Sequence, residues 1–338
     1  MNRLIITFLL VLLSSCSSIK TIHGQKTNQV SPDQVELNLE GVAEVTTEST
    51  PVISPVEETV RLGERGGDIY SETEATEINQ VIAKRLRIGL ALGPGLYRTI
   101  NYVALLKHLE RKSIAPQLIT GTGFGAIVAA MYAHGMTPEM IEWNFYRYFR
   151  EKGNHRPYEE EWYEDVDRLL LEKLKNKMLQ DSGKKFYLTL YNAKTKKTYY
   201  FDKGNTRDLL LKNMQLTHNG RANDKTTYTA AFENEVFNAR LMKRLGADFS
   251  LGADVLGNKF DFEDSSEFLV GIYGKAAGRI AREKKNFDYF FNLPVTQYGL
   301  DSTQNGASSM TKTQEYLKTH TSEVKKLMQN KLTSSSQL

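Results

Sequence analysis

The chain has 338 residues, of which 40% are hydrophobic, so it is long enough to bury the core of one large domain. The formal net charge is only +4, basic residues alternate with acidic ones, and no nucleic-acid-binding motif occurs, so we expect no nucleic-acid partner. The single cysteine, Cys16, excludes a disulfide within the chain and a cysteine-ligated metal. The histidines form no metal-ligand pattern either, and we expect no metal or cofactor.

The N-terminus has the pattern of an export signal. A basic start precedes an apolar run from Leu4 to Leu13, which is too short to cross a bilayer as a helix. The run ends in Leu-Ser-Ser-Cys16, which resembles the lipobox of bacterial lipoproteins. By this resemblance residues 1–15 are a cleaved lipoprotein signal peptide, Cys16 is the lipidated N-terminus, and Ser17 favours the outer membrane over the inner one. The alternative is a plain secretory signal with an incidental cysteine.

The segment after the cysteine is acidic and shows no sustained helix or strand period. We interpret residues 16–80 as the lipidated cysteine and a disordered tether. Residues 17–80 contain twelve Asp and Glu against four Lys and Arg, a net charge of −8. Arg3 adds +1, so the total of +4 leaves +11 for residues 81–338. Tether and body are expected to solvate each other or to attract loosely, and a contact of the body with anionic lipid headgroups is the alternative.

The body reads as one domain, residues 81–330, with a disordered tail at 331–338. Its predicted elements, in chain order, are a strand at 88–92, a helix over 100–109, a strand at 117–120, helices at 124–133 and from Thr137-Pro138, a charged helical stretch within 157–180, a hairpin over 186–201, a helix at 236–245, a strand within 289–296 and an amphipathic helix at 312–328. Successive strand-helix units favour a parallel α/β sheet with right-handed crossovers. Gly274 and Gly278 are four residues apart, which indicates close helix packing rather than a phosphate loop.

Three blocks resemble bacterial patatin-like phospholipases in order and spacing. "LALGPGLYR" at 90–98 is similar to their glycine-rich opening, "GTGFGA" at 121–126 occupies the place of their "GTSMGA" elbow, and "LGAD" at 245–248 is similar to the block after their catalytic aspartate motif. The resemblance covers about residues 86–328. It implies a three-layer α/β fold with a mainly parallel central sheet flanked by helices. Members are lipid acyl hydrolases in which a serine attacks the ester, an aspartate assists proton transfer and the glycine-rich loop holds the oxyanion.

Both members of the dyad are missing at the matching positions. The elbow consists of Gly121, Gly123 and Gly125, and Gly123 stands where the family has its serine. The family's spacing places the aspartate at Ala230, which cannot act as a base. A glycine at the nucleophile position would relieve elbow strain of about 1–3 kcal/mol while preserving the turn. We therefore expect no intact catalytic site.

The oxyanion loop is only partly retained. Gly93, Gly95 and Arg98 match the family and form the expected vestigial binding loop. Pro94 removes an N–H donor, and Leu96 and Thr99 stand at positions where the resemblance leads us to expect glycine.

A relocated nucleophile is the competing interpretation. Its candidates are the hydroxyls of Thr120 and Thr122 and, as the base, Glu233, Glu235 or Asp254. A triad at unrelated positions, such as Ser250 with His218, has no spacing in its support.

We therefore expect a membrane-anchored, patatin-like lipoprotein that is a catalytically inactive pseudoenzyme, acting in lipid binding or as a scaffold or regulator in the cell envelope. The alternative is an active lipid acyl hydrolase of the phospholipase A type. A third possibility is a structural lipoprotein whose fold is a globular spacer, which predicts no pocket at the glycine-rich loop. The expected partners are the membrane, through Cys16, and a lipid ligand or envelope protein. The expected location is the bacterial outer membrane, with the periplasmic or surface side left open.

Overall fold

The computed structural model describes residues 86–152, 155–216, 228–237, 239–257, 266–304 and 306–335. The predicted signal peptide, Cys16 and the acidic tether lie outside the described residues, as does His218. Within the described ranges, no helix is both long enough and apolar enough to pass through a membrane.

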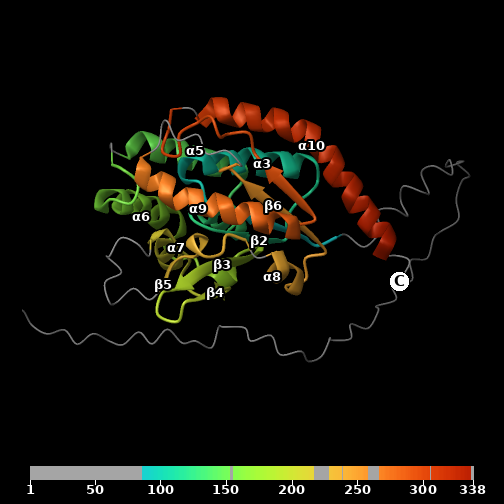
Figure 1. The fold of residues 1–338 in the computed structure, drawn as a ribbon, viewed down its shortest axis with the longest axis horizontal. Helices are drawn as coiled ribbons and strands as arrows, with labels where there is room; N and C mark the ends of the chain where they lie inside the picture. The colour runs from blue at the N-terminus through green and yellow to red at the C-terminus, as the bar shows by residue number, and fades with distance from the viewer. Residues whose placement is uncertain are drawn as a thin grey trace, which may run out of the picture. The chain divides into compact units, whose positions relative to one another are not determined.

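A mainly parallel sheet organises the described part of the chain (Figure 1). Its strands are β1 (Ile88–Leu92), β2 (Leu118–Gly121), β3 (Lys185–Asn192), β4 (Lys197–Phe201), β5 (Tyr228–Ala230), β6 (Phe249–Asp254) and β7 (Tyr289–Asn292). The order is β4-β3-β2-β1-β6-β7, and β5 pairs with β3 off this path. Strands β3, β2, β1, β6 and β7 run parallel, whereas β4 and β5 are antiparallel to β3. Every residue of β1 is buried, as expected for a central parallel strand covered on both faces.

Helices and short 3-10 turns flank the sheet. They are η2 (Leu96–Ile100), α3 (Asn101–Arg111), α4 (Phe124–Ala133), α5 (Pro138–Glu151), α6 (Glu160–Leu174), η3 (Leu179–Asp181), α7 (Thr206–Met214), η5 (Ala231–Glu233), α8 (Ala239–Arg244), α9 (Glu267–Glu283), η6 (Lys284–Asn286) and α10 (Gly306–Ser335). The predicted α/β class with a parallel sheet and flanking helices is thus confirmed.

The second strand-helix unit follows its prediction closely: the strand lies one residue later than the predicted 117–120, and the helix has the predicted bounds 124–133. All ten residues of α4 are buried, so this helix is apolar on every face. It ends before Gly135, whose φ of 87° is a left-handed conformation that glycine adopts without strain. The next helix, α5, begins as predicted, because the Thr137 side chain accepts a hydrogen bond from the N–H of Met140 and Pro138 takes the first helical position.

The last helix is longer than its predicted span. Helix α10 extends from Gly306 to Ser335, beyond the predicted 312–328 and into the predicted tail at 331–338. It packs against α3 through buried polar side chains as well as apolar ones. The Thr313 hydroxyl donates to Asn101 Oδ1 (2.9 Å), and the Thr321 hydroxyl lies 2.6 Å from His108 Nε2. At the N-terminal extension, the buried Ser309 hydroxyl accepts from Asn101 Nδ2 (3.1 Å), a contact that a count of apolar residues misses.

The close helix packing predicted at Gly274 and Gly278 is not found. Both residues lie on α9 as predicted, but no described atom outside the helix lies within 4 Å of the position that a Cβ would take at either glycine. The same holds for Gly271. Close packing against another described helix therefore does not explain these glycines.

Candidate functional site

The turn between β2 and α4 has the geometry of a strained strand-to-helix elbow. Gly123 adopts φ 55° and ψ −140°, a conformation that costs a residue with a side chain about 1–3 kcal/mol. A Cβ at Gly121 would lie 2.6 Å from the Ala126 Cα, and a Cβ at Gly125 would lie 2.2 Å from the Gly93 carbonyl oxygen. Glycine is therefore required at 123 by the backbone conformation and at 121 and 125 by close packing.

The space beside Gly123 is apolar and occupied. A Cβ at this residue would lie 3.1 Å from the Pro94 Cβ and 3.4 Å from Cε1 of Phe232. Phe232 is fully buried and stacks on Tyr273 of α9, with ring centroids 5.4 Å apart and planes 15° apart. The Phe232–Tyr273 stack therefore joins the elbow to α9, and a side chain at residue 123 would meet its edge.

The backbone of Gly123 is held by a side chain that the sequence analysis did not single out. Asn213, fully buried on α7, accepts from the Gly123 N–H (3.4 Å) and donates to the Gly123 carbonyl oxygen (3.1 Å). The available signal was a polar residue on the inward, apolar side of that helix. Asn213 thus holds the turn by contacting both of its peptide groups.

The glycine-rich loop after β1 is tied into the fold. The Gly93 N–H donates to the carbonyl oxygen of Ala253 on β6 (3.0 Å), and Pro94 has no N–H to offer. A Cβ at Gly95 would lie 2.2 Å from Val255, so this position requires glycine. Leu96, which stands where glycine is expected, has φ 44°, a strained backbone conformation that glycine would adopt without cost. The loop keeps its shape, but one of its N–H groups is already bonded and another is absent.

Arg98 is also part of the packing. Its side chain is 3% exposed, and its guanidinium donates to the carbonyl oxygens of Tyr298, Thr296 (2.9 Å) and Val255 (3.5 Å). It lies near Asp254, whose carboxylate accepts from two backbone N–H groups of the turn after β6. Burial raises the pKa of Asp254, while these hydrogen bonds and the charge of Arg98 act in the opposite direction. Both groups stabilise loops at the C-terminal edge of the sheet.

No acid stands at the expected aspartate position. Ala230 ends β5, is fully buried, and donates its N–H to the Gln215 carbonyl oxygen (2.7 Å). Farther along, Glu235 accepts a hydrogen bond from the Tyr200 hydroxyl (2.7 Å). Glu233 faces the groove described below.

The alternative nucleophiles are buried. Thr120 lies within β2, and the Thr122 hydroxyl makes a long hydrogen bond to the Val236 carbonyl oxygen (3.4 Å). Ser250 is fully buried on β6, where its hydroxyl donates to the Asp288 carboxylate (2.6 Å). In the described ranges, no group of three or more His, Cys, Asp and Glu side chains could hold a metal ion.

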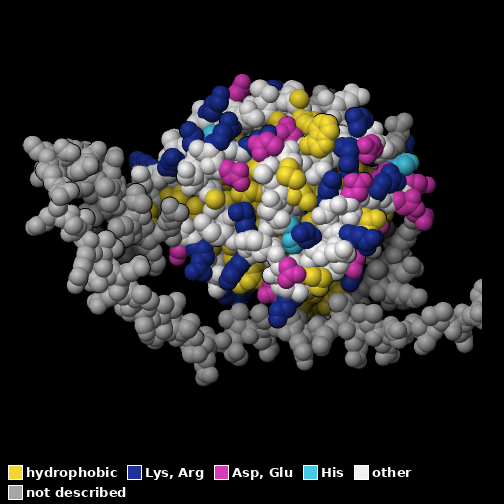
Figure 2. Space-filling view, turned by 180° about the vertical axis from the view of Figure 1, so that it is seen from behind, with side chains coloured by type: hydrophobic (Ala, Val, Ile, Leu, Met, Phe, Trp, Pro, Cys, Tyr) yellow, Lys and Arg dark blue, Asp and Glu magenta, His cyan; other side chains and the backbone are white. Residues whose placement is uncertain are grey.

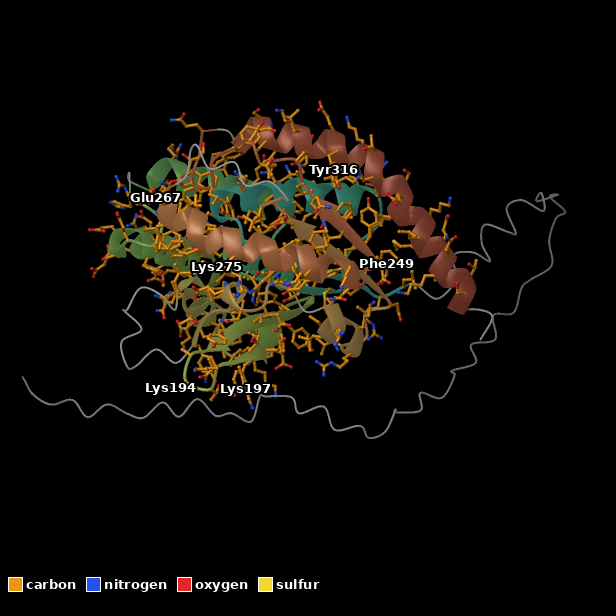
Figure 3. All side chains as sticks on the ribbon, viewed as in Figure 1. Lys194, Lys197, Phe249, Glu267, Lys275 and Tyr316 are labelled. Carbon is orange, nitrogen blue, oxygen red and sulfur yellow. The ribbon has the colours of Figure 1, made fainter. Side chains whose placement is uncertain are left out.

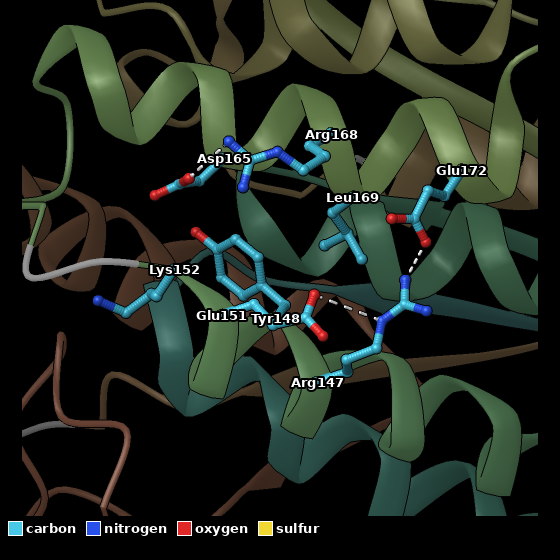
Figure 4. A pocket seen from close by; sticks show the side chains of 8 residues that line it. All are labelled: Arg147, Tyr148, Glu151, Lys152, Asp165, Arg168, Leu169 and Glu172. Atoms are coloured by element: carbon cyan, nitrogen blue, oxygen red, sulfur yellow. Dashed lines mark hydrogen bonds and ion pairs between the residues drawn. The ribbon is translucent and has the colours of Figure 1, made fainter.

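A small crevice lies between α5 and α6 (Figure 4). Its volume of about 20 Å³ leaves room for a single water molecule. Its charges largely compensate one another: Arg147 pairs with Glu151 and Glu172, and Arg168 pairs with Asp165 (3.3 Å). The crevice is therefore too small and too well neutralised to take a lipid.

A larger groove lies on the α9 side of the Phe232–Tyr273 stack. It has a volume of about 620 Å³ and lies between α9, η5 and the β3–β4 turn. Its lining is Tyr191, Ala193, Lys196, Glu233, Asn234, Glu267, Phe268, Gly271, Ile272, Lys275 and Arg279. The groove is thus both apolar and charged, and it begins next to the expected aspartate position without including Gly123.

The elbow can be tested by adding a methyl group. We expect Gly123→Ala to lower the free energy of unfolding by about 1–3 kcal/mol, because of its backbone conformation and the contact with Pro94. The control is Gly135→Ala, which also has a positive φ but no neighbour within 4 Å of the added Cβ. Urea unfolding of the two variants compares them. An equal or smaller loss at residue 123 would contradict the crowded elbow.

Comparison with known proteins finds a family match for part of the chain. Residues 90–252 match the family model for patatin-like phospholipase. Among solved structures, VipD from Legionella pneumophila is similar at TM-score 0.41 and 11% identity, covering 73% of this chain and 68% of that one. The type III effector protein ExoU is similar at TM-score 0.38 and 12% identity, covering 74% of this chain and only 54% of that one. No curated protein sequence gives a significant match. The family match covers residues 90–252, a little under half of the chain, and this segment, which is similar to a patatin-like phospholipase domain, runs from β1 to β6 and contains the elbow between β2 and α4.

Proposed function

We propose that this chain is a membrane-anchored, catalytically inactive patatin-like protein that acts by binding, as a lipid-binding or scaffolding component of the cell envelope. The observation that carries the proposal is the environment of Gly123. The position that matches the family's nucleophile has no side chain, and a Cβ there would lie 3.1 Å from the Pro94 Cβ and 3.4 Å from Cε1 of Phe232.

The chemistry of ester cleavage explains why this matters. An acyl-enzyme needs a hydroxyl or thiol nucleophile, a base to remove its proton, and free N–H donors for the oxyanion. Gly123 and Ala230 supply neither of the first two, and the Gly93 N–H is bonded to Ala253. Loss of a single oxyanion donor typically costs about 10²–10³ in rate. All three groups act together in forming the acyl-enzyme, so restoring one of them leaves the step without the others.

The proposal predicts no turnover. We expect the full chain to release no fatty acid from phospholipid vesicles and no product from short-chain esters, measured beside an active patatin-like phospholipase. We also expect Gly123→Ser with Ala230→Asp to stay inactive, because Pro94 and Phe232 crowd the new side chain.

Two results would contradict this expectation. Turnover by the wild-type chain that Thr122→Val or Thr120→Val abolishes would support a relocated nucleophile. A gain of activity in the double variant would mean that the space above Gly123 still accepts an ester.

The anchor is tested separately. If Cys16 is lipidated, bacteria fed labelled palmitate should incorporate the label into the wild-type protein and not into Cys16→Ser. Mass spectrometry should place the new N-terminus at residue 16 in the wild type only. Equal labelling of both proteins, or cleavage elsewhere, would contradict the lipoprotein proposal. Either result leaves the question of turnover untouched.

A further inference from the structure

The exposed side of helix α9 carries more basic than acidic residues. With about 100° of rotation per residue, its inward side is formed by Leu269, Tyr273, Ala276 and Ile280, all of them buried. The exposed side carries Glu267, Phe268, Gly271, Lys275, Gly278 and Arg282, with the half-buried Ile272 and Arg279 at its edge. Phe268 is 44% exposed. An aromatic residue, an aliphatic residue and three cations therefore share one accessible stripe, flanked by Glu267 and Glu283.

The cations of this stripe form no close ion pair within the described ranges, although Glu233 and Glu267 line the same groove. Among the described residues, no salt bridge or hydrogen bond is made by the side chain of Lys275, Arg279 or Arg282. The nearby Glu283 carboxylate accepts from the N–H groups of Val236 (3.5 Å) and Phe237 (2.7 Å), and burial raises its pKa. Arg279 attracts this carboxylate, but Glu283 is already engaged with the backbone.

Other elements extend the positive charge around α9. The β3–β4 turn contributes Lys196 to the groove, and Lys194 and Lys197 lie at the tip of the same hairpin (Figure 3). Near the end of α9, Glu283 lines a second hollow with Glu235 and with Arg240 and Arg244 of α8, and the two acids of this hollow balance its two cations. The opposite side of the molecule carries cations and anions interspersed (Figure 2).

We propose that this basic face, formed by Lys196, Lys275, Arg279 and Arg282 around Phe268, binds the surface of an anionic lipid bilayer. This inference rests on the proposed binding function and names the partner that would be bound. Long cationic side chains on separate elements can reach lipid phosphates without a fixed partner geometry, and each contributes favourably near an anionic surface. An exposed phenyl ring and the apolar lining of the groove can enter the interfacial region between them.

Charge reversal on α9 tests this face. The full chain is mixed with phosphatidylcholine vesicles with and without phosphatidylglycerol, and binding is measured by co-sedimentation at several salt concentrations. We expect the wild type to prefer the anionic vesicles, and the preference to fall with salt. The triple variant Lys275→Glu, Arg279→Glu, Arg282→Glu should lose roughly tenfold or more in affinity for the anionic vesicles. The N-terminal apolar run is common to all proteins compared.

The matched control makes the same charge change on another helix. Lys318→Glu, Lys325→Glu, Lys326→Glu alters three exposed lysines of α10 and should keep most of the preference. A glutamine triple variant at the α9 positions provides a second reading if circular dichroism shows that the glutamate variant is unfolded. Equal losses in the α9 and α10 variants, or no anionic preference in the wild type, would overturn the proposal; the latter result would favour an acidic protein segment as the occupant. Fatty-acid release from the vesicles would contradict catalytic inactivity alone.

Discussion

The close approach of two backbone segments is the constraint on which this domain depends. The loop after β1 and the turn after β2 meet at the same edge of the sheet, because these strands are parallel neighbours. The Thr122 N–H donates to the Leu92 carbonyl oxygen (3.1 Å), and a Cβ at Gly125 would lie 2.2 Å from the Gly93 oxygen. Because Gly125 has no Cβ, the first turn of α4 can lie this close to the Gly93 carbonyl oxygen. The glycine pattern is therefore a packing requirement, whether or not a reaction takes place there.

Catalysis would add demands that packing does not. A reactive elbow needs a side chain in a strained conformation, open space in front of it and unpaired N–H donors. Here glycine occupies the strained position, the Phe232 ring would lie 3.4 Å from a Cβ at that residue, and the Gly93 N–H is bonded to β6. Each of these three features is compatible with a stable fold and requires no reaction at the site. Together they are the physical basis of the proposal that the domain acts by binding and not by catalysis.

The sequence predicted the parts of this picture that depend on local signals. The buried strand at 88–92, the helix at 124–133 and the Thr137-Pro138 helix start all follow from apolar runs and capping residues, and all are confirmed. The hydrogen bonds of Asn213 with Gly123 were not predictable, because they join residues 90 positions apart with no pattern between them. The Phe232–Tyr273 stack was missed for the same reason. Sequence could show that reactive groups are absent at matching positions, but not what fills the space.

Covalent labelling tests the central claim most directly, because it asks for an activated nucleophile rather than for the right substrate. The full-length wild-type chain would be incubated with a fluorophosphonate, and its intact mass measured beside an active patatin-like phospholipase. An elbow with glycine at residue 123 and buried threonines predicts an unchanged mass while the active enzyme gains the adduct. A stoichiometric adduct on a serine or threonine of this chain would contradict the account and identify the residue that replaces the missing nucleophile.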